Sequence, residues 1–321
     1  MAACTNILVP LALTQPQRST LEKAAEGTGT ACSFVYAPKP SDDQLAAANV
    51  IIGMVPPERL PLATSLAWLQ LSWAGAGPYC APGVIPDDVV LTCASGAYGL
   101  TCSEHMLAFT FDLVRRFSEY HRTREQRVWH AAGAITSVEG STVVVLGLGD
   151  IGGAYARKMH ALGARVIGVR RAVKAVPDYA ERVATIHELD EVLPEADIVA
   201  MALPGSAGTA HVLDERRLRL MKPTAYLLNV GRGNAIDPAG LKAVLADGLL
   251  AGVALDVTEP EPLPPDDELW SYDRVFITPH VSGQLFLPET LNRIVDIAAN
   301  NLRAWLSGKA LDHVVNRDLG Y

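Results

Sequence analysis

The sequence predicts an α/β fold of doubly wound parallel sheets, divided between two domains. Short apolar runs alternate with helical segments along nearly the whole chain, which is typical of strand–helix–strand units. One of these runs, residues 143–146, leads directly into a glycine-rich turn and a helix. The length of 321 residues favours two domains over one.

Composition and charge exclude several classes of protein. Hydrophobic residues make up 49% of the chain and charged residues 19%, which is enough apolar material for two buried cores. The formal net charge of −8 argues against nucleic acid or an anionic membrane as a partner. The apolar runs fall short of the roughly 18 residues of a membrane span, and Pro10 interrupts the N-terminal one. We therefore expect a cytoplasmic protein.

The cysteine and histidine spacings predict neither a disulfide framework nor a metal site. His105, His121 and His130 lack metal-ligand spacing, and we expect no bound metal. The cysteines are scattered, with no C-x-x-C pair, which suits buried thiols in a reducing compartment; the five are Cys4, Cys32, Cys80, Cys93 and Cys102.

The first 99 residues predict one parallel sheet. Helices are expected at residues 19–26 and 41–48, and strands at 6–9, 31–36, 50–54, 68–72 and 89–92. The loop W-A-G-A-G-P, residues 73–78, follows the fourth of these strands. Glycines at the carboxyl end of a strand expose backbone N–H groups that bind a carboxylate. An ordinary surface turn is the alternative interpretation.

An amphipathic helix is expected next, over residues 103–120, with Ser103 as its N-cap. Its length suits a connection that leaves the first domain and enters the second. The polar, basic segment at 122–129 is interpreted either as an arm across a subunit interface or as a solvated helix end.

The stretch S-T-V-V-V-L-G-L-G-D-I-G-G, residues 141–153, contains the G-x-G-x-x-G pattern of a dinucleotide-binding turn. Gly147 permits the tight turn, Gly149 lets the backbone approach a pyrophosphate, and Gly152 lets the helix pack on the strand. The diphosphate would then lie at the N-terminus of the helix expected at 154–162. A glycine-rich turn without a ligand is the alternative.

The strand expected at 165–169 ends in Arg170 and Arg171, with Lys174 shortly after and no Asp or Glu in reach. NAD-binding turns place an acidic residue there, which bonds the ribose 2′-hydroxyl. A carboxylate would repel a 2′-phosphate, whereas an arginine fork binds it. The pattern favours NADP(H), with NAD(H) left open. Arginines that only solvate a strand end are the alternative.

Four later strands each end in polar or glycine-rich residues. Ligands of open α/β sheets bind outside the carboxyl ends of the strands, so the convergence of these ends predicts the functional site. The strands are expected at residues 197–203, 225–230, 252–256 and 275–278.

Reactive side chains follow these strands at Arg232, Glu261 and His280. Hydride exchange between a nicotinamide and a 2-hydroxy acid needs a group that takes and returns the hydroxyl proton, and histidine titrates in the right range. Glu261 would orient His280 and stabilise its charged form, while Arg232 would bind the substrate carboxylate and polarise the carbonyl. Asp256 would accept a hydrogen bond from the nicotinamide carboxamide. A surface ion pair, a loop carboxylate and a helix cap are the respective alternatives.

These motifs resemble the D-isomer-specific 2-hydroxyacid dehydrogenase family. The resemblance rests on G-L-G-D-I-G, N-V-G-R-G, A-L-D-V-T-E-P-E-P-L-P and I-T-P-H-V-S-G in the family's order, and extends to L-S-W-A-G-A-G and S-E-H-M-L-A. It implies two Rossmann-like domains with a cleft between them. A flavodoxin-like substrate domain would take residues 1–99 and 288–321, and a dinucleotide-binding domain residues 100–287. The family usually forms homodimers through the dinucleotide domain.

The resemblance also implies the roles of individual residues. Arg232, Glu261 and His280 fall on the catalytic arginine, glutamate and histidine of the family. Substrate binding is implied for Trp73, Ala74 and Gly75 together with Arg232 and His280. Cofactor binding is implied for Gly147, Gly149, Asp150, Ile151, Gly152, Arg170, Arg171, Leu203, Pro204, Thr209, Val230, Gly231, Asp256 and Gly283.

Four sites in the sequence depart from the family pattern or bear on the substrate. Arg170 replaces the acidic ribose contact, as in NADP-using members. Ala76-Gly77-Pro78 stands where the family often has Asp or Asn, and Gln284-Leu285-Phe286 adds bulk after the histidine. Glu261 argues against a formate-oxidising enzyme, because formate-oxidising relatives have glutamine at this position.

We therefore expect an NADPH-preferring reductase of a small 2-oxo acid such as glyoxylate or hydroxypyruvate. The alternatives are a dinucleotide-sensing regulatory protein of corepressor type and another oxidoreductase such as a phosphite dehydrogenase.

Overall fold

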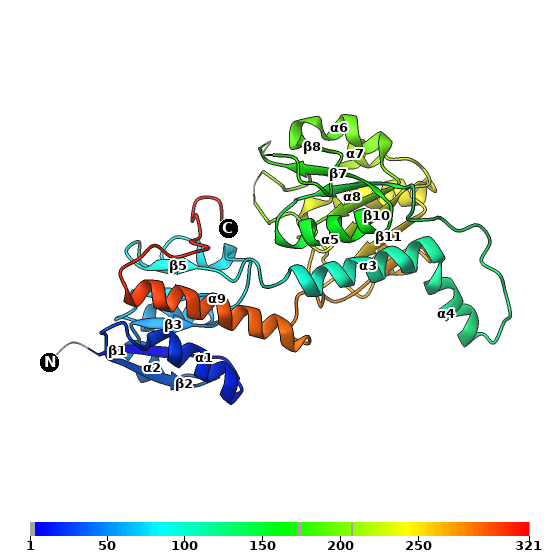
Figure 1. Cartoon of the computed structure of the whole chain (residues 1–321). Coiled ribbons are helices and arrows are strands. Elements are labelled where there is room, and N and C mark those ends of the chain that lie inside the picture. The colour runs from blue at the N-terminus through cyan, green and yellow to red at the C-terminus, as the bar shows by residue number, and fades with distance from the viewer. Residues whose placement is uncertain (1–3, 173–174, 207, 321) are drawn as a thin grey trace. The chain divides into compact units, whose positions relative to one another are not determined.

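The computed structural model describes residues 4–172, 175–206 and 208–320, and the chain forms two compact units (Figure 1). The first unit comprises Met1–Tyr98 and Leu285–Tyr321, and the second comprises Gly99–Gln284. Each unit is an α/β fold built on a parallel sheet, as the sequence predicts. Lys174 lies outside the described residues.

The first unit contains a five-stranded parallel sheet in the order β2-β1-β3-β4-β5, which is the flavodoxin-like order. Its strands are β1 (Thr5–Val9), β2 (Cys32–Tyr36), β3 (Val50–Ile52), β4 (Trp68–Gln70) and β5 (Val90–Thr92). Its helices are α1 (Gln15–Ala25), α2 (Asp42–Ala47) and α9 (Pro288–Leu306).

Both faces of this sheet are covered. Ile7 and Val9 of β1 point to one core cluster and Leu8 points to the other, as the alternation along a strand requires. Helix α9 packs beside α1 on the face of Ile7. The C-terminal segment therefore belongs to the same unit as the N-terminal strands, and its helix ends at Leu306, well before the end of the chain.

The second unit contains a seven-stranded parallel sheet in the order β12-β11-β10-β9-β6-β7-β8. The order reverses between β6 and β9, which makes this the doubly wound arrangement of dinucleotide-binding domains. Its strands are β6 (Thr142–Leu146), β7 (Arg165–Arg170), β8 (Arg182–Thr185), β9 (Ile198–Met201), β10 (Tyr226–Asn229), β11 (Gly252–Leu255) and β12 (Val275–Ile277). Its helices are α3 (Gly99–Arg115), α4 (Phe117–Glu125), α5 (Asp150–Ala161), α6 (Leu189–Val192), α7 (Glu215–Leu218) and α8 (Pro238–Ala246).

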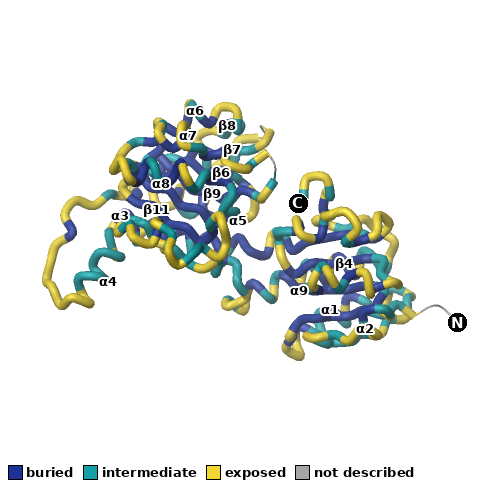
Figure 2. The backbone as a smooth tube through the Cα atoms, turned by 180° about the vertical axis from the view of Figure 1, so that it is seen from behind, coloured by how far each residue is buried: buried dark blue, intermediate teal, exposed yellow. Residues whose placement is uncertain are grey.

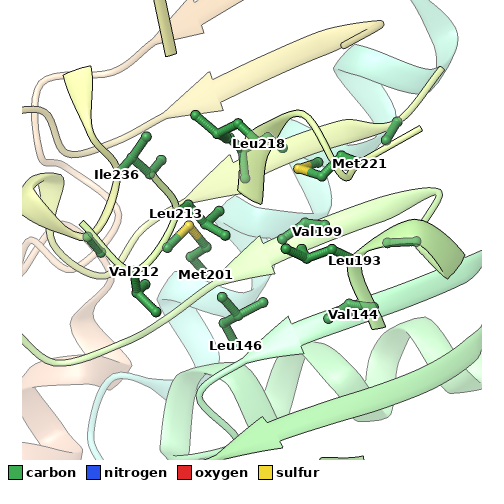
Figure 3. Close-up of a cluster of buried hydrophobic side chains, with 14 of the residues drawn as sticks. Val144, Leu146, Leu193, Val199, Met201, Val212, Leu213, Leu218, Met221 and Ile236 are labelled. Carbon is green, nitrogen blue, oxygen red and sulfur yellow. The ribbon is translucent and has the colours of Figure 1, made fainter. Parts of the chain in front are cut away.

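Burial on both faces explains why the central strands are continuous apolar runs. Every residue of β6 is buried. Val144 and Leu146 join the cluster under α6, α7 and α8 (Figure 3), whereas Val143 and Val145 join the one under α3 and α5. The tube in Figure 2 shows this burial along the strands of the sheet.

The single helix expected at residues 103–120 is wrong in its bounds. The helix begins at Gly99 and stops at Arg115, and Arg116 adopts a left-handed conformation (φ 60°) before α4 begins. Ser103 is an interior residue whose hydroxyl donates to the Leu100 carbonyl, so it is not the N-cap. The Gly99 N–H bonds instead to the Asp150 carboxylate, from a distant part of the sequence.

Two other elements differ from expectation. Helix α1 begins four residues early, at Gln15, because Thr14 and Gln17 form a capping box. Strand β8 was not expected; it is a short edge strand in which only Ala184 is buried, so it lacks an apolar run.

Helix α4 and the segment after it, residues 117–137, form an arm that extends from the second unit (Figures 1 and 2). No residue of α4 is buried, and Trp129 beyond it is fully exposed. Within the described residues, no helix is both long and apolar enough to cross a membrane. All five cysteines are free; Cys93 and Cys102 are buried, whereas Cys4 is exposed and the other two are half-buried.

Candidate active site

The glycine turn between β6 and α5 has an open face. A Cβ atom on Gly147 would lie 2.7 Å from the Ala202 carbonyl oxygen, and one on Gly152 would lie 1.9 Å from the Gly147 oxygen. These two glycines are therefore required by close backbone packing. A Cβ on Gly149 would meet nothing within 4 Å. The turn thus leaves an accessible backbone at the N-terminus of α5, which is the arrangement that binds a diphosphate.

A guanidinium lies beside this turn. Arg170 closes β7, and its Nη2 donates to the Leu148 carbonyl oxygen at 3.0 Å. The side chain of Leu148 in turn packs over β7, where a Cβ on Gly168 would lie only 2.0 Å from Leu148 Cδ1. Arg171 follows at the exposed end of the strand. The positive charge expected for a 2′-phosphate is therefore placed next to the turn.

The loops after β9, β10 and β11 pack directly on one another. A Cβ on Gly231 would lie 2.6 Å from the Leu203 backbone, and one on Gly233 would lie 1.9 Å from the Thr258 carbonyl oxygen. Both glycines of N-V-G-R-G are thus required by these approaches. They hold Arg232 between two loops, and its Nη1 donates to the Gly231 carbonyl oxygen at 2.8 Å.

The other residues expected to contact the cofactor lie along the same edge of the sheet. The Thr209 hydroxyl bonds within its own loop, to the Pro204 carbonyl oxygen at 2.7 Å. Ile151 lies in the first turn of α5. Leu203 and Val230 are buried behind the loops, and Gly283 follows the histidine loop.

His280 and Glu261 form a hydrogen-bonded pair, with His280 Nδ1 2.6 Å from Glu261 Oε1. An ionised carboxylate only accepts, so Nδ1 carries the proton of this bond, and Nε2 is the ring nitrogen outside it. Both side chains are partly exposed, at 35% and 42%. His280 has a left-handed backbone (φ 51°), a conformation that surrounding contacts must hold.

Asp256 supplies those contacts. Its side chain is fully buried, and its carboxylate accepts from the Thr278 hydroxyl at 2.5 Å and from the Val281 and Ser282 N–H groups at 2.8 and 3.0 Å. Its carbonyl oxygen accepts from the His280 N–H at 2.8 Å. Burial raises the pKa of the Asp256 carboxyl, but these hydrogen bonds outweigh burial, and the pKa lies below its usual value.

His105 of α3 joins this network. Its Nε2 lies 3.2 Å from the Thr278 hydroxyl, whose own proton goes to Asp256, so the ring donates at Nε2. Burial lowers the pKa of His105, and the nearby Asp256 charge opposes that shift. The nicotinamide contact expected of Asp256 stays a prediction, beside its evident role in holding the histidine loop.

Arg232 and Glu261 line the same hollow. It has a volume of about 600 Å³ and is also lined by Gly205, Ser206, Asn234 and Glu259. Because His280 bonds to Glu261, the guanidinium, the carboxylate and the imidazole gather at one edge of the sheet. The carboxyl ends of β9, β10, β11 and β12 thus converge as expected.

The loop expected to bind the substrate carboxylate belongs to the first unit. Trp73 follows β4, is 42% exposed, and accepts at its carbonyl oxygen from the Ala94 N–H. Ala74 and Gly75 come next, before a short 3-10 helix at Gly77–Tyr79. The roles of Trp73, Ala74 and Gly75 stay predictions.

Sequence reasoning missed two residues that build the site. Asn229, buried at the end of β10, donates to the Arg232 carbonyl oxygen and accepts from the Gly231 N–H, and so shapes the arginine turn. Its position as a polar residue at the end of an apolar run, two residues before a glycine, was a usable signal. Thr278, between Asp256 and His105, had no comparable signal because its partners are distant in the sequence. No group of His, Cys, Asp and Glu side chains in the described part of the chain is arranged to hold a metal.

Known proteins are similar to this chain in sequence and in structure. The model of the D-isomer specific 2-hydroxyacid dehydrogenase NAD-binding domain matches residues 107–282. A protein named glyoxylate reductase from Pyrococcus furiosus is 33% identical over 235 residues, which cover 73% of this chain and 68% of the relative.

Solved structures extend the similarity to the whole chain. A family protein from Aeromonas salmonicida has a TM-score of 0.83 at 29% identity, covering 98% of this chain and 99% of its own. A D-isomer specific 2-hydroxyacid dehydrogenase from Xanthobacter autotrophicus, in complex with NADPH and MES, has a TM-score of 0.81 at 26% identity, covering 99% and 100%. The chain therefore belongs to the D-isomer-specific 2-hydroxyacid dehydrogenase family of NAD(P)-dependent oxidoreductases.

Proposed function

We propose that the protein is an NADPH-preferring reductase that converts a small 2-oxo acid, of the glyoxylate or hydroxypyruvate type, into the D-2-hydroxy acid. The observation that carries this proposal is the His280–Glu261 hydrogen bond at 2.6 Å beside the hollow lined by Arg232. It provides a proton donor, a group that stabilises the donor's charged form, and a fixed positive charge.

Each of the three side chains has a defined part in reduction. His280 donates a proton from Nε2 to the carbonyl oxygen as that oxygen gains negative charge. Glu261 keeps the other ring nitrogen protonated and orients the imidazole. Arg232 binds the substrate carboxylate and stabilises the developing charge. NADPH, when bound, supplies the hydride.

The residues around the glycine turn fit NADPH. The open backbone at Gly149 admits the diphosphate, and Arg170 lies beside the turn, where it can pair with a 2′-phosphate. Arg171 adds a second positive charge. The Xanthobacter relative, which was solved with NADPH, supports this preference. Binding of NADH with lower affinity is compatible with the same turn.

The substrate class rests on charge and size. A guanidinium suits a carboxylate in bidentate fashion. Substrate binding by Trp73, Ala74 and Gly75 stays a prediction from the family resemblance. The Pyrococcus relative's name supports glyoxylate. Ala76, Gly77 and Pro78 leave the loop without the Asp or Asn that many relatives have, so we extend the proposal only to small 2-oxo acids.

A substrate panel tests the proposal. Purified protein is mixed with NADPH or NADH and with glyoxylate, hydroxypyruvate, pyruvate or 2-oxoglutarate, and the loss of absorbance of the reduced nicotinamide is followed. We expect turnover of the small acids with NADPH, and none with the matched His280→Ala protein. NADPH binding without oxidation by any acid would favour a regulatory protein instead, and oxidation of phosphite with NADP would favour a phosphite dehydrogenase.

We also propose that the arm at 117–137 mediates a homodimer. Trp129 is fully exposed and Val128 is 51% exposed. Exposed apolar side chains are unfavourable in water, and contact with a partner's surface would bury them. A groove of about 360 Å³ at the base of the arm exposes Phe111, Ile135 and Leu162, and offers an apolar surface on the second copy. Sedimentation should show a dimer that Trp129→Ala weakens; a monomeric wild-type protein at micromolar concentration would contradict this. The cytoplasmic location stays a prediction.

A further inference from the structure

The first turn of α3 lies between the glycine turn and the histidine loop, and it is hydrogen-bonded to both. On one side, the Gly99 N–H donates to Asp150 Oδ2 at 2.7 Å. On the other side, the Thr101 hydroxyl donates to the Ser282 carbonyl oxygen at 3.1 Å, and the Cys102 thiol approaches the same oxygen at 3.4 Å. All of these residues belong to the second unit.

The contact with Asp150 is close and charge-assisted. A Cβ on Gly99 would lie 2.3 Å from Asp150 Oδ1 and 3.0 Å from the Asp150 carbonyl oxygen, so only glycine fits at the start of α3. The carboxylate accepts the first N–H of α3 and also lies in the first turn of α5. One negative charge thus stabilises the positive ends of two helices.

The contact with Ser282 leads directly to the histidine. Ser282 lies two residues after His280, and its N–H donates to Asp256 Oδ2 at 3.0 Å. The His280 N–H donates to the Asp256 carbonyl oxygen. The loop is therefore held by Asp256 at its N–H groups and by α3 at a carbonyl. Since His280 has a left-handed backbone, its position depends on such contacts.

We propose that the first turn of α3 is a splint between the glycine turn and the His280 loop, and that Asp150 and Thr101 are positioning residues for His280. Asp150 holds the splint at the glycine turn, and Thr101 holds it at the loop. This inference rests on the proposed function, because positioning has consequences for turnover only if His280 carries the proton.

The splint assigns the Asp150 side chain a role different from cofactor binding. A carboxylate in the first turn of α5 would repel a diphosphate bound there, whereas its bond to Gly99 directs it to α3. Removing its charge should leave NADPH affinity unchanged or improve it. Removing its acceptor oxygen should break the hydrogen bond that holds the start of α3 at the glycine turn. The two effects separate in Asp150→Asn, which keeps an acceptor oxygen without the charge.

The test compares three variants with two controls. Asp150→Ala removes the acceptor, Asp150→Asn keeps it, and Thr101→Val removes only the hydroxyl. Asp214→Ala is the matched control for a lost helix cap, since Asp214 caps α7 alone. Thr123→Val is the matched control for a lost hydroxyl, since Thr123 bonds within the arm. For each protein we would measure kcat, the KM and Kd for NADPH, and hydrogen exchange of the peptide spanning residues 278–284 without ligand.

We expect kcat to fall about ten- to hundredfold in Asp150→Ala, since small displacements of a reacting group have effects of this size. The Kd for NADPH should not rise, and exchange over 278–284 should accelerate. Thr101→Val should show the same pattern more weakly, because the Cys102 contact remains. Asp150→Asn should lie between the wild type and Asp150→Ala, because it keeps an acceptor oxygen but loses the charge that strengthens the bond to Gly99. Both controls should resemble the wild type in kcat and in exchange.

Several results would overturn the splint. One is weaker NADPH binding in both Asp150 variants with unchanged exchange, which would make the carboxylate a cofactor ligand. Equal losses of kcat in Asp150→Asn and Asp150→Ala would also contradict it, as would unchanged exchange in Thr101→Val. If the wild type reduces no 2-oxo acid, the proposed function fails, and the exchange measurement still decides whether the splint exists.

Discussion

Replacing Arg170 with alanine should remove most of the preference for NADPH over NADH. The Arg170 guanidinium is held next to the glycine turn by its bond to the Leu148 carbonyl oxygen at 3.0 Å. It is thereby positioned before the dinucleotide binds, and little side-chain freedom is lost on binding. NADPH differs from NADH only in the 2′-phosphate, so a contact with that phosphate changes the affinity for NADPH alone.

The size of the effect follows from the kind of bond that is lost. A hydrogen bond to a charged group contributes about 1.5–3 kcal/mol, and each 1.4 kcal/mol is a factor of ten in affinity. We therefore expect the Kd for NADPH to rise roughly ten- to hundredfold, while the Kd for NADH changes by less than about threefold. The lost bond to Leu148 should lower the free energy of unfolding by about 1 kcal/mol.

Calorimetric titration with each dinucleotide measures these constants directly. Arg182→Ala is the matched control: Arg182 lies on the neighbouring strand β8, is exposed, and pairs with Glu195. It removes the same charge from the neighbouring strand, at the amino end of β8, without touching the turn. Equal losses for NADPH and NADH in Arg170→Ala, or the same loss of NADPH affinity in Arg182→Ala, would refute the assignment.

Three further predictions concern the reaction. His280→Ala and Arg232→Ala should each lower kcat by two orders of magnitude or more, since acid–base help alone contributes ~10²–10⁴; near-normal steady-state rates in either would remove it from the mechanism. Glu261→Gln should lower kcat, because a neutral amide replaces the charge-assisted bond of the carboxylate to His280 Nδ1 with a weaker one; a kcat equal to that of the wild type would argue against the pair. Gly233→Ala should lower kcat/KM about a hundredfold and destabilise by about 1–3 kcal/mol, because its Cβ would lie 1.9 Å from the Thr258 oxygen; thermal unfolding and rate measurements check both.

Much of the fold could be predicted because a strand that is buried on both faces consists of consecutive apolar residues, which are visible in the sequence. The strands of the second unit are buried on both faces, so they read as apolar runs such as 143–146. Strand β8 was not predicted because it lies at the sheet edge, has one buried residue and therefore has no apolar run. The bounds of α3 were missed for a different reason: the group that caps Gly99 is Asp150, 51 residues away.

The sequence by itself determined which side chains end up at the carboxyl edge of the second sheet, since parallel strands place their ends there whatever their order. Arg232, Glu261 and His280 could therefore be named from spacing and residue type. Only the tertiary structure decided how they are held. The bonds of Asp256 to the histidine loop, of Asn229 to the arginine turn, and of α3 to both Asp150 and Ser282 require donor and acceptor atoms to be placed to within a few tenths of an ångström. Such distances arise from packing among distant segments, which leaves no local pattern in the chain.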